Sequence, residues 1–509
     1  MDVLRYDHCY TGEKVMSRGC IVAANVALFC LLAFARSGYF SPAHRLSGVG
    51  VSRSEITPDV LAARTGRMIE SQTFAIMRDP VALAGAQRIC SPRLQQAFQR
   101  ASVETGVPAS LLSAIAYLES WGDARAESPA GPKGIMQFAE ATARANGLRI
   151  VYATHYKTTR AKRLVKKTKG KPVYKTVVSR TAYQVKVRDD RFLPDRAVIA
   201  AARYLARMED KFGGRDWAVF AYHCGEGCVM ELQGLAREAL GQNAELTVAG
   251  MFFAASPASH RELYEALQRH MQRDWSPTYW FRVKRAEQLL HLYQTEPGEF
   301  RKLVEQYRNP QNPERRANDR LVVWMRSEDV LYQNCDDLRR ATGTQLVPVF
   351  QNPEFFGFSV AGMNSRRVFS SDPDARDLYL QASPAAIGTL SYIAFETRRL
   401  FDAMKPKGDP FVPLNVAELV NTKDALLSAS GRAGGLDLPQ HCTGQVFDLD
   451  LAGMPRAERE ALSFVLDELG WDGYLGFIQT NGDTLHIGCS PSARDFFAQV
   501  FQDAVEAEK

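Results

Sequence analysis

Residues 111–137 read LLSAIAYLESWGDARAESPAGPKGIMQ and begin with the pattern of an amphipathic helix. One face of this expected helix carries four apolar residues, Leu111, Leu112, Ile115 and Leu118. Glu119 falls on the same face, between Leu112 and Ile115. A carboxyl group held against apolar neighbours loses solvation of its charged form, so its pKa rises. Glu119 is therefore a candidate general acid, and the alternative is a buried structural Glu bonded to a backbone or Tyr donor.

Helical spacing continues on both sides of this stretch, in residues 94–104, 108–119, 195–212 and 216–222. A basic insertion interrupts it, because residues 151–188 contain twelve Lys or Arg and no Asp or Glu. Its second half alternates like a strand after a turn-like Lys-Gly-Lys-Pro, which predicts a basic hairpin. A solvated insertion and a clamp for an acidic polymer both remain open. Its four scattered Tyr residues make a poor stacking platform for nucleic acid, which we do not expect as a partner.

The chain has 509 residues, of which 46% are hydrophobic and 24% charged, with a net charge of +6. This balance excludes a disordered tail and a multi-span membrane protein. Near the N-terminus, Arg18 precedes an apolar run over 21–35 that ends in Ala-Phe-Ala, as in an export signal. The run is short for a membrane span of about 20 residues. We therefore expect export to the periplasm or cell envelope, with membrane contact only if residues 16–35 stay as an uncleaved anchor; Met16 is an alternative start.

After removal of such a signal, six cysteines remain: Cys90, Cys224, Cys228, Cys335, Cys442 and Cys489. An even number in an oxidising compartment permits disulfides.

The patterns predict a multidomain, mainly α protein with an α+β C-terminal part. Its expected parts are a signal peptide or anchor (16–35), an N-terminal extension (36–90), a helical domain (91–240) with the insertion 151–188, a mostly helical connector (241–340) and an α+β domain (341–509). Within these parts we expect a linker at 309–316, strands at 321–325 and 346–350, and a last amphipathic helix at 491–506.

Three sequence blocks follow one another in the helical domain. They are Glu119-Ser120, then Ser128-Pro-Ala-Gly with Gly134-Ile-Met-Gln137, then Ala221-Tyr-His-Cys-Gly225. With this order and spacing, residues 91–235 resemble the soluble lytic transglycosylases, whose goose-lysozyme-like domains carry Glu-Ser, Ser-Pro-x-Gly-x-x-Gly-Leu-Met-Gln and Ala-Tyr-Asn-x-Gly. The resemblance implies a lysozyme-like fold that cleaves, without a cofactor, the β-1,4 bond between N-acetylmuramic acid and N-acetylglucosamine in peptidoglycan glycan strands.

By this resemblance, Glu119 protonates the leaving oxygen and then acts as a base. The substrate's N-acetyl carbonyl and C6 hydroxyl replace the second carboxylate of other glycosidases, giving a 1,6-anhydro product. Substrate-binding positions fall on Ser128, Gln137, Tyr222 and His223, and Met136 is expected in the core. His223 stands where the family has Asn, so the third block is the weakest. A wall-binding scaffold without catalysis and a hydrolytic goose-type lysozyme remain alternatives.

A second constellation lies near the C-terminus, where His441 and Asp448 are followed by Asp483-Thr-Leu-His486. Two His and one Asp make a three-ligand zinc set with an open position, as hydrolytic sites need. Residues 410–505 resemble the D,D-carboxypeptidase and Hedgehog-type zinc peptidases, which carry His-x-x-Gly-x-Ala-x-Asp and Glu-x-x-His. Asp483 then takes the position of the peptidase base, although its side chain is shorter than Glu.

This resemblance leaves three alternatives for the C-terminal domain: an active peptidase on peptidoglycan stem peptides, a metal-binding or vestigial peptide-recognition domain, or accidental spacing. If both ligand segments are strands, Cys442 and Cys489 point away from the metal face. They then either pair as a disulfide or stay as two buried thiols.

Overall fold

The computed structural model describes residues 57–508 except 169–170, 242–244, 272–277, 309–328, 362, 364–374, 406–409, 430–438 and 482. The expected signal (16–35), the linker at 309–316 and the strand at 321–325 lie outside the described residues and stay predictions. The described chain forms two compact units. The first comprises Asp79–Ala218 and Ala286–Arg301, and the second comprises the residues up to Arg78, Val219–Arg285 and Lys302–Lys509.

The first unit is built around one apolar helix, α6 (Ala109–Ser120), in which every residue from Leu111 to Tyr117 is buried. It packs against α4 (Ala82–Ile89), α5 (Pro92–Thr105) and α8 (Pro194–Phe212). Proline occupies the first turn of α5 and α8, and each ends at a glycine with positive φ, so local sequence sets their ends. The helices predicted at 94–104, 108–119 and 195–212 are confirmed, and 216–222 lies within α9 (Arg215–Cys224).

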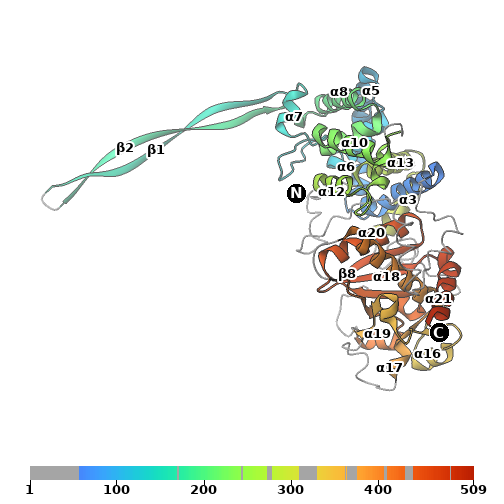
Figure 1. Cartoon of the computed structure of the whole chain (residues 1–509). Helices are drawn as coiled ribbons and strands as arrows, with labels where there is room; N and C mark the ends of the chain where they lie inside the picture. The colour runs from blue at the N-terminus through green and yellow to red at the C-terminus, as the bar shows by residue number, and fades with distance from the viewer. Residues whose placement is uncertain are drawn as a thin grey trace. The chain divides into compact units, whose positions relative to one another are not determined.

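The basic insertion is a two-stranded antiparallel ribbon, β1 (Ile150–Thr168) and β2 (Lys171–Asp189), which confirms the predicted hairpin (Figure 1). Most of its register runs from Tyr152 opposite Lys186 to Leu164 opposite Tyr174. No third strand among the described residues pairs with it, so neither outer edge of the ribbon has a hydrogen-bonded neighbouring strand. Strands of 19 residues at about 3.3 Å per residue give a ribbon of about 60 Å. A short helix, α7 (Glu140–Ala145), precedes it.

The second unit begins with α3 (Pro58–Met77), which contacts α11 (Val248–Ala254) and α20 (Arg456–Trp471). Arg64 on α3 donates two hydrogen bonds of 2.7 Å to the carboxylate of Asp472, just after α20. The N-terminal helix therefore belongs with the C-terminal part of the chain, which its sequence did not predict. Further helices are α10 (Glu226–Leu240), α12 (Arg261–Met271), α13 (Tyr279–Thr295) and α14 (Pro297–Arg308). A boundary between the units along the chain falls within each of the last two.

A five-stranded sheet forms the C-terminal part of this unit, in the order β4-β6-β7-β9-β8. Its strands are β4 (Phe358–Ser359), β6 (Leu414–Glu418), β7 (Val446–Asp450), β9 (Thr484–Cys489) and β8 (Leu475–Asn481). Only β4 and β6 pair in parallel. The long helix α18 (Pro384–Met404) packs on α20, α21 (Arg494–Glu508), β7 and β9. The Cys489 side chain reaches Thr389 on α18, so alternate residues of β9, including His486, face away from that helix.

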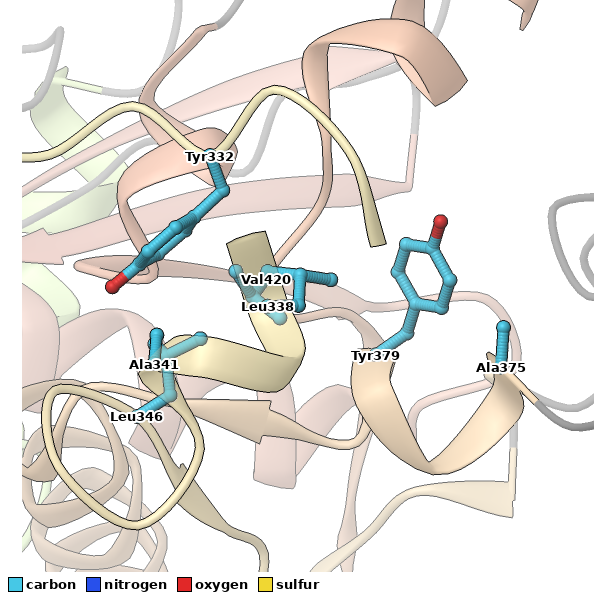
Figure 2. Close-up of a cluster of buried hydrophobic side chains, with 7 residues drawn as sticks. All are labelled: Tyr332, Leu338, Ala341, Leu346, Ala375, Tyr379 and Val420. Atoms are coloured by element: carbon cyan, nitrogen blue, oxygen red, sulfur yellow. The ribbon is translucent and has the colours of Figure 1, made fainter. Parts of the chain in front are cut away.

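Beside this sheet, β3 (Val347–Pro348) pairs with β5 (Gln381–Ala382), so the predicted strand at 346–350 is found in part. Two short helices, α16 (Cys335–Ala341) and α17 (Arg376–Tyr379), contribute residues to a small apolar cluster (Figure 2). Its members are Tyr332, Leu338, Ala341, Leu346, Ala375, Tyr379 and Val420. The Tyr332 amide donates to the Cys442 carbonyl at 2.8 Å, so the cluster supports the turn η9 (Pro439–Thr443). The Tyr332 carbonyl accepts from the amide of Lys423, the first residue of α19 (Lys423–Ala429), at 3.1 Å.

Within the described residues, no helix is both long enough and apolar enough to cross a bilayer.

Candidate functional site

Glu119 is the next-to-last residue of α6 and is half-buried. The helix ends at Trp121, which adopts a left-handed φ of 52°, and its amide donates to the Tyr117 carbonyl at 2.9 Å. The Trp121 ring packs edge-on against Tyr117 with centroids 4.6 Å apart. Its carbonyl accepts from the Arg88 side chain at 2.9 Å. These contacts restrict the conformation of the last turn of α6, so they fix the end of the helix that carries Glu119.

Ser120 joins this helix end to the second sequence block. Its hydroxyl is buried and lies 2.8 Å from the Ile135 carbonyl, to which it donates. Gly134 has a φ of +77°, and a Cβ there would stand 1.9 Å from the Arg191 carbonyl oxygen, so only glycine fits. Met136 is fully buried, as predicted for a core residue. The Glu-Ser pair and the Gly134–Gln137 segment therefore form one connected piece.

Gln137 and Ser128, the predicted substrate-binding residues of this block, hold the loop itself. The Gln137 amide nitrogen donates to the carbonyls of Gly134 at 2.8 Å and Ala126 at 3.3 Å. The half-buried Ser128 donates its backbone N–H to the Pro132 carbonyl at 2.9 Å and accepts from the Ala130 amide at 3.3 Å. Both side chains thus have roles in loop geometry beside any contact with a ligand.

Arg191, which the sequence did not single out, clamps this loop to the root of the hairpin. It is 1% exposed and follows β2 in the turn η3 (Asp190–Phe192). Its guanidinium donates to the Asp189 carboxylate at 2.9 and 2.7 Å and to the carbonyls of Phe138 at 3.0 Å and Gly131 at 3.3 Å. Burial raises the pKa of Asp189, but hydrogen bonds from Arg191 and Lys186 outweigh it and lower the pKa to about 2. The sequence did contain a signal for this arginine: Asp189 and Asp190, directly before it, are the first acidic residues after the basic segment 151–188.

Tyr222 and His223, the predicted residues of the third block, lie in the second unit, whereas Glu119, Ser128 and Gln137 lie in the first. Both are half-buried on α9. The His223 ring stacks on Tyr279, with centroids 4.3 Å apart and planes 14° apart. This contact gives the imidazole a fixed orientation.

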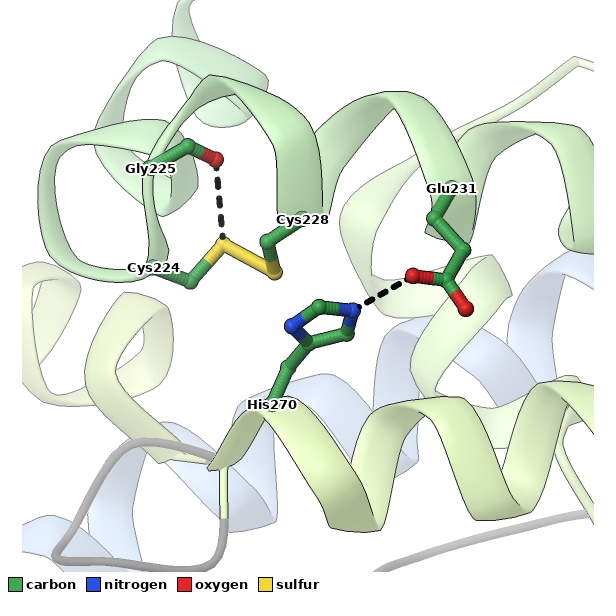
Figure 3. Close-up of a disulfide and its surroundings, with 5 residues drawn as sticks. All are labelled: Cys224, Gly225, Cys228, Glu231 and His270. Carbon is green, nitrogen blue, oxygen red and sulfur yellow. Dashed lines mark hydrogen bonds and ion pairs between the residues drawn. A yellow bond between two sulfur atoms is a disulfide. The ribbon is translucent and has the colours of Figure 1, made fainter.

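A disulfide follows these residues directly. Cys224 at the end of α9 pairs with Cys228 in the first turn of α10, with Cα atoms 5.8 Å apart (Figure 3). Farther along α10, Glu231 forms a 2.7 Å hydrogen bond with His270 of α12. Cys442 and Cys489 are both buried and free, so the alternative disulfide between them is wrong.

The second predicted site comes together in the second unit. His441, Asp448 and His486 are buried, and one ligand atom from each lies within 4.8 Å of the others. Asp448 Oδ1 is 3.1 Å from His441 Nε2 and 2.7 Å from His486 Nδ1. His441 lies in the turn η9 rather than in a strand, and Gly444 with φ +68° completes that turn, where a Cβ would stand 2.5 Å from Leu346. The spacing His-x-x-Gly therefore reflects a real turn.

Two observations indicate that the cluster is suited to bind a divalent cation. His441 Nδ1 donates to the Leu419 carbonyl at 2.7 Å, the second contact that metal-binding histidines usually have. His486 Nε2 is buried and has no hydrogen-bond partner among the described residues. The electrostatics also permit a metal-free cluster: burial lowers the pKa of His441, but Glu418 and Asp448 raise it to about 9. Burial lowers the pKa of His486.

Asp483, the predicted peptidase base, is exposed in the turn between β8 and β9 and lies 3.4 Å from the Arg459 guanidinium. Glu418, at the end of β6, interacts electrostatically with both histidines and acts to raise the pKa of each. No sequence motif marks it.

The comparisons with known proteins match the part of the chain that contains Glu119 and the second sequence block. The Transglycosylase SLT domain family matches residues 96–163 and 173–244, on either side of the hairpin tip. Two relatives are "Membrane-bound lytic murein transglycosylase F 2" of Alkalilimnicola ehrlichii, 28% identical over 30% of this chain, and "Peptidoglycan transglycosylase gp16" of Escherichia phage T7, 35% identical over 26%. A third, "Membrane-bound lytic murein transglycosylase F 1" of A. ehrlichii, is 26% identical over 41% of the chain.

These alignments span 27%, 7% and 35% of the three relatives. No solved structure matches the chain. On the family match and the relatives together, this mainly helical chain carries a Transglycosylase SLT domain in residues 96–163 and 173–244.

Proposed function

We propose that this protein cleaves the β-1,4 bond between N-acetylmuramic acid and N-acetylglucosamine of peptidoglycan, leaving 1,6-anhydromuramic ends. The observation that carries the proposal is the connected piece formed by Glu119, Ser120 and the Gly134–Gln137 segment, inside the matched family domain. Because peptidoglycan lies outside the cytoplasm, the activity requires the export predicted from residues 16–35.

In the proposed reaction, the Glu119 carboxyl donates its proton to the glycosidic oxygen as the C1–O bond breaks. The substrate's N-acetyl carbonyl supports the positive charge that develops at C1. The C6 hydroxyl then attacks C1 and gives its proton to Glu119, which restores the acid. No water is consumed, and no second enzyme carboxylate is needed, unlike in two-carboxylate glycosidases.

Purified protein incubated with murein sacculi tests this proposal, with mass spectrometry of the released fragments. We expect anhydro ends, whereas reducing ends would indicate a lysozyme and no fragments a wall-binding scaffold. Glu119→Gln should reduce cleavage at least about 100-fold, since general acid catalysis contributes roughly that much or more. The matched control is Glu127→Gln, an exposed neighbour that pairs with Lys133, which should keep full activity. A chelator should leave glycan cleavage unchanged.

The exposed cations of the hairpin support the proposal that it binds an acidic polymer. Six of its cations are exposed and form no ion pair with any described acidic residue: Lys157, Arg160, Lys162, Arg163, Lys175 and Arg180. Arg180 stacks over the exposed Tyr156 ring at 3.9 Å. We infer that the ribbon contacts acidic groups of the wall polymer, since clustered cations of one sign attract a polyanion.

The buried His441–Asp448–His486 cluster supports a second candidate function, a divalent-metal site in the second unit. Two imidazoles and one carboxylate are a donor set suited to zinc. Bound zinc would polarise a peptide carbonyl and lower the pKa of water, which is the chemistry of stem-peptide hydrolysis. Metal analysis of the purified protein tests the site: we expect one zinc per chain, and none after His486→Ala.

A further inference from the structure

Glu418 stands in a cross-strand row with two members of the metal cluster. In the sheet register, Glu418 of β6 pairs with Asp448 of β7, and Asp448 pairs with His486 of β9. Directly paired residues of antiparallel strands project from the same face, with Cβ atoms about 5 Å apart. A bulge between Val416 and Glu418 shifts the register of β6 at this point. The bulge therefore places Glu418 on the face that carries the cluster.

The same end of β6 also holds His441. The His441 ring donates to the Leu419 carbonyl at 2.7 Å, and the His441 carbonyl accepts from the Asn421 amide at 2.9 Å. The Asn421 side chain donates to Glu418 Oε1 at 2.7 Å. One short segment thus fixes the turn that carries the third cluster member and orients the Glu418 carboxylate. Electrostatic interaction of Glu418 with both His441 and His486 agrees with this placement.

Asp483, unlike Glu418, is not part of the cross-strand row with Asp448 and His486. It lies in the turn before β9, is exposed, and pairs with Arg459 of α20. It precedes His486 by three positions and lies outside β9, which begins at Thr484, so the pairing of the strands does not hold it beside the cluster. The sequence spacing Asp-x-x-His therefore does not bring this carboxylate to the cluster.

We propose that Glu418, in place of Asp483, is the acidic partner of the His441–Asp448–His486 cluster. Its negative charge strengthens the binding of a divalent cation there, and its carboxylate holds the water that attacks a peptide carbonyl. This inference rests on the metal site proposed above. The water oxygen bonds to the carbonyl carbon, and its proton passes to the Glu418 carboxylate. Glu418 then gives that proton to the amide nitrogen as the C–N bond breaks, yielding a carboxyl and an amine.

Zinc affinity of the full-length protein, measured by competition with a chromophoric chelator, tests the assignment without requiring a known peptide substrate. Loss of a carboxylate that supports a metal site costs roughly 10–100-fold in affinity, so Glu418→Gln should weaken zinc binding by that factor. Glu418→Asp should restore part of it. Asp483→Asn, the matched control, should bind like the wild type, and His441→Ala should lose binding.

Equal zinc affinity of wild type and Glu418→Gln would overturn the role of Glu418 while leaving the metal site intact. A large loss in Asp483→Asn would also overturn it. Failure of the wild type to bind zinc would remove the metal site itself, and the inference with it. If Glu418→Gln does not fold, Asn421→Ala keeps the carboxylate but removes its orienting donor, and should weaken zinc binding by a smaller factor; unchanged affinity there would contradict the proposed orientation.

Discussion

Replacing Arg191 with Ala should destabilise the first unit far more than loss of an ordinary surface arginine. The guanidinium is 1% exposed and forms a two-point contact with Asp189, whose side chain is 4% exposed. Removing one partner of a buried ion pair costs about 3–5 kcal/mol, because the other charge stays buried without compensation. Lys186 remains 3.1 Å from Asp189, so we expect the lower end, about 3 kcal/mol.

Urea unfolding gives the change in unfolding free energy. The control is Arg100→Ala, which breaks an ion pair with Asp195 whose side chains are 59% and 52% exposed, and should cost less than about 1 kcal/mol. Hydrogen exchange localises the effect: the Lys133 amide, which donates to the Phe138 carbonyl at 3.1 Å, should lose protection in Arg191→Ala. Equal destabilisation by the two substitutions would refute the reasoning that burial makes this arginine a structural clamp.

The remaining predictions concern acid stability, the hairpin and the disulfide. The lowered pKa of Asp189, about 2, means that its contribution is present above the ordinary carboxyl pKa and disappears as pH falls from about 4 towards 2. The melting temperature of the wild type should therefore fall more steeply over that range than that of Asp189→Asn, and parallel curves would contradict this. Changing Lys157, Arg160, Arg163 and Lys175 together to Gln should weaken sacculus binding in pull-down assays more at low than at high salt, because exposed charges are screened; a salt-independent loss would point to misfolding. Replacing Cys224 and Cys228 by Ala should lower unfolding free energy by about 2 kcal/mol, the entropy expected for so short a loop, and make melting insensitive to reductant; an unchanged midpoint would show that the bridge does not constrain the chain.

Local sequence determined the helices of the first unit and the hairpin. The spacing of Leu111, Leu112 and Ile115, the prolines that begin α5 and α8, and the glycines that end them act over one or two turns, so they can be read without the fold. The blocks at Glu119 and Gly134 were equally local, and their family resemblance is confirmed by the domain match.

Contacts between distant segments were decided only by the tertiary structure. Arg191 reads as one more cation at the edge of a basic insertion, yet packing buries it against the loop of the second block. The bulge in β6 sets Glu418 in register with Asp448, and Asp448 is in register with His486. Strand register, which no local pattern specifies, decides which side chains share a face. Cys224 pairs with Cys228 for the same kind of reason: a disulfide requires its Cα atoms within about 7 Å, a distance that depends on how α9 turns into α10.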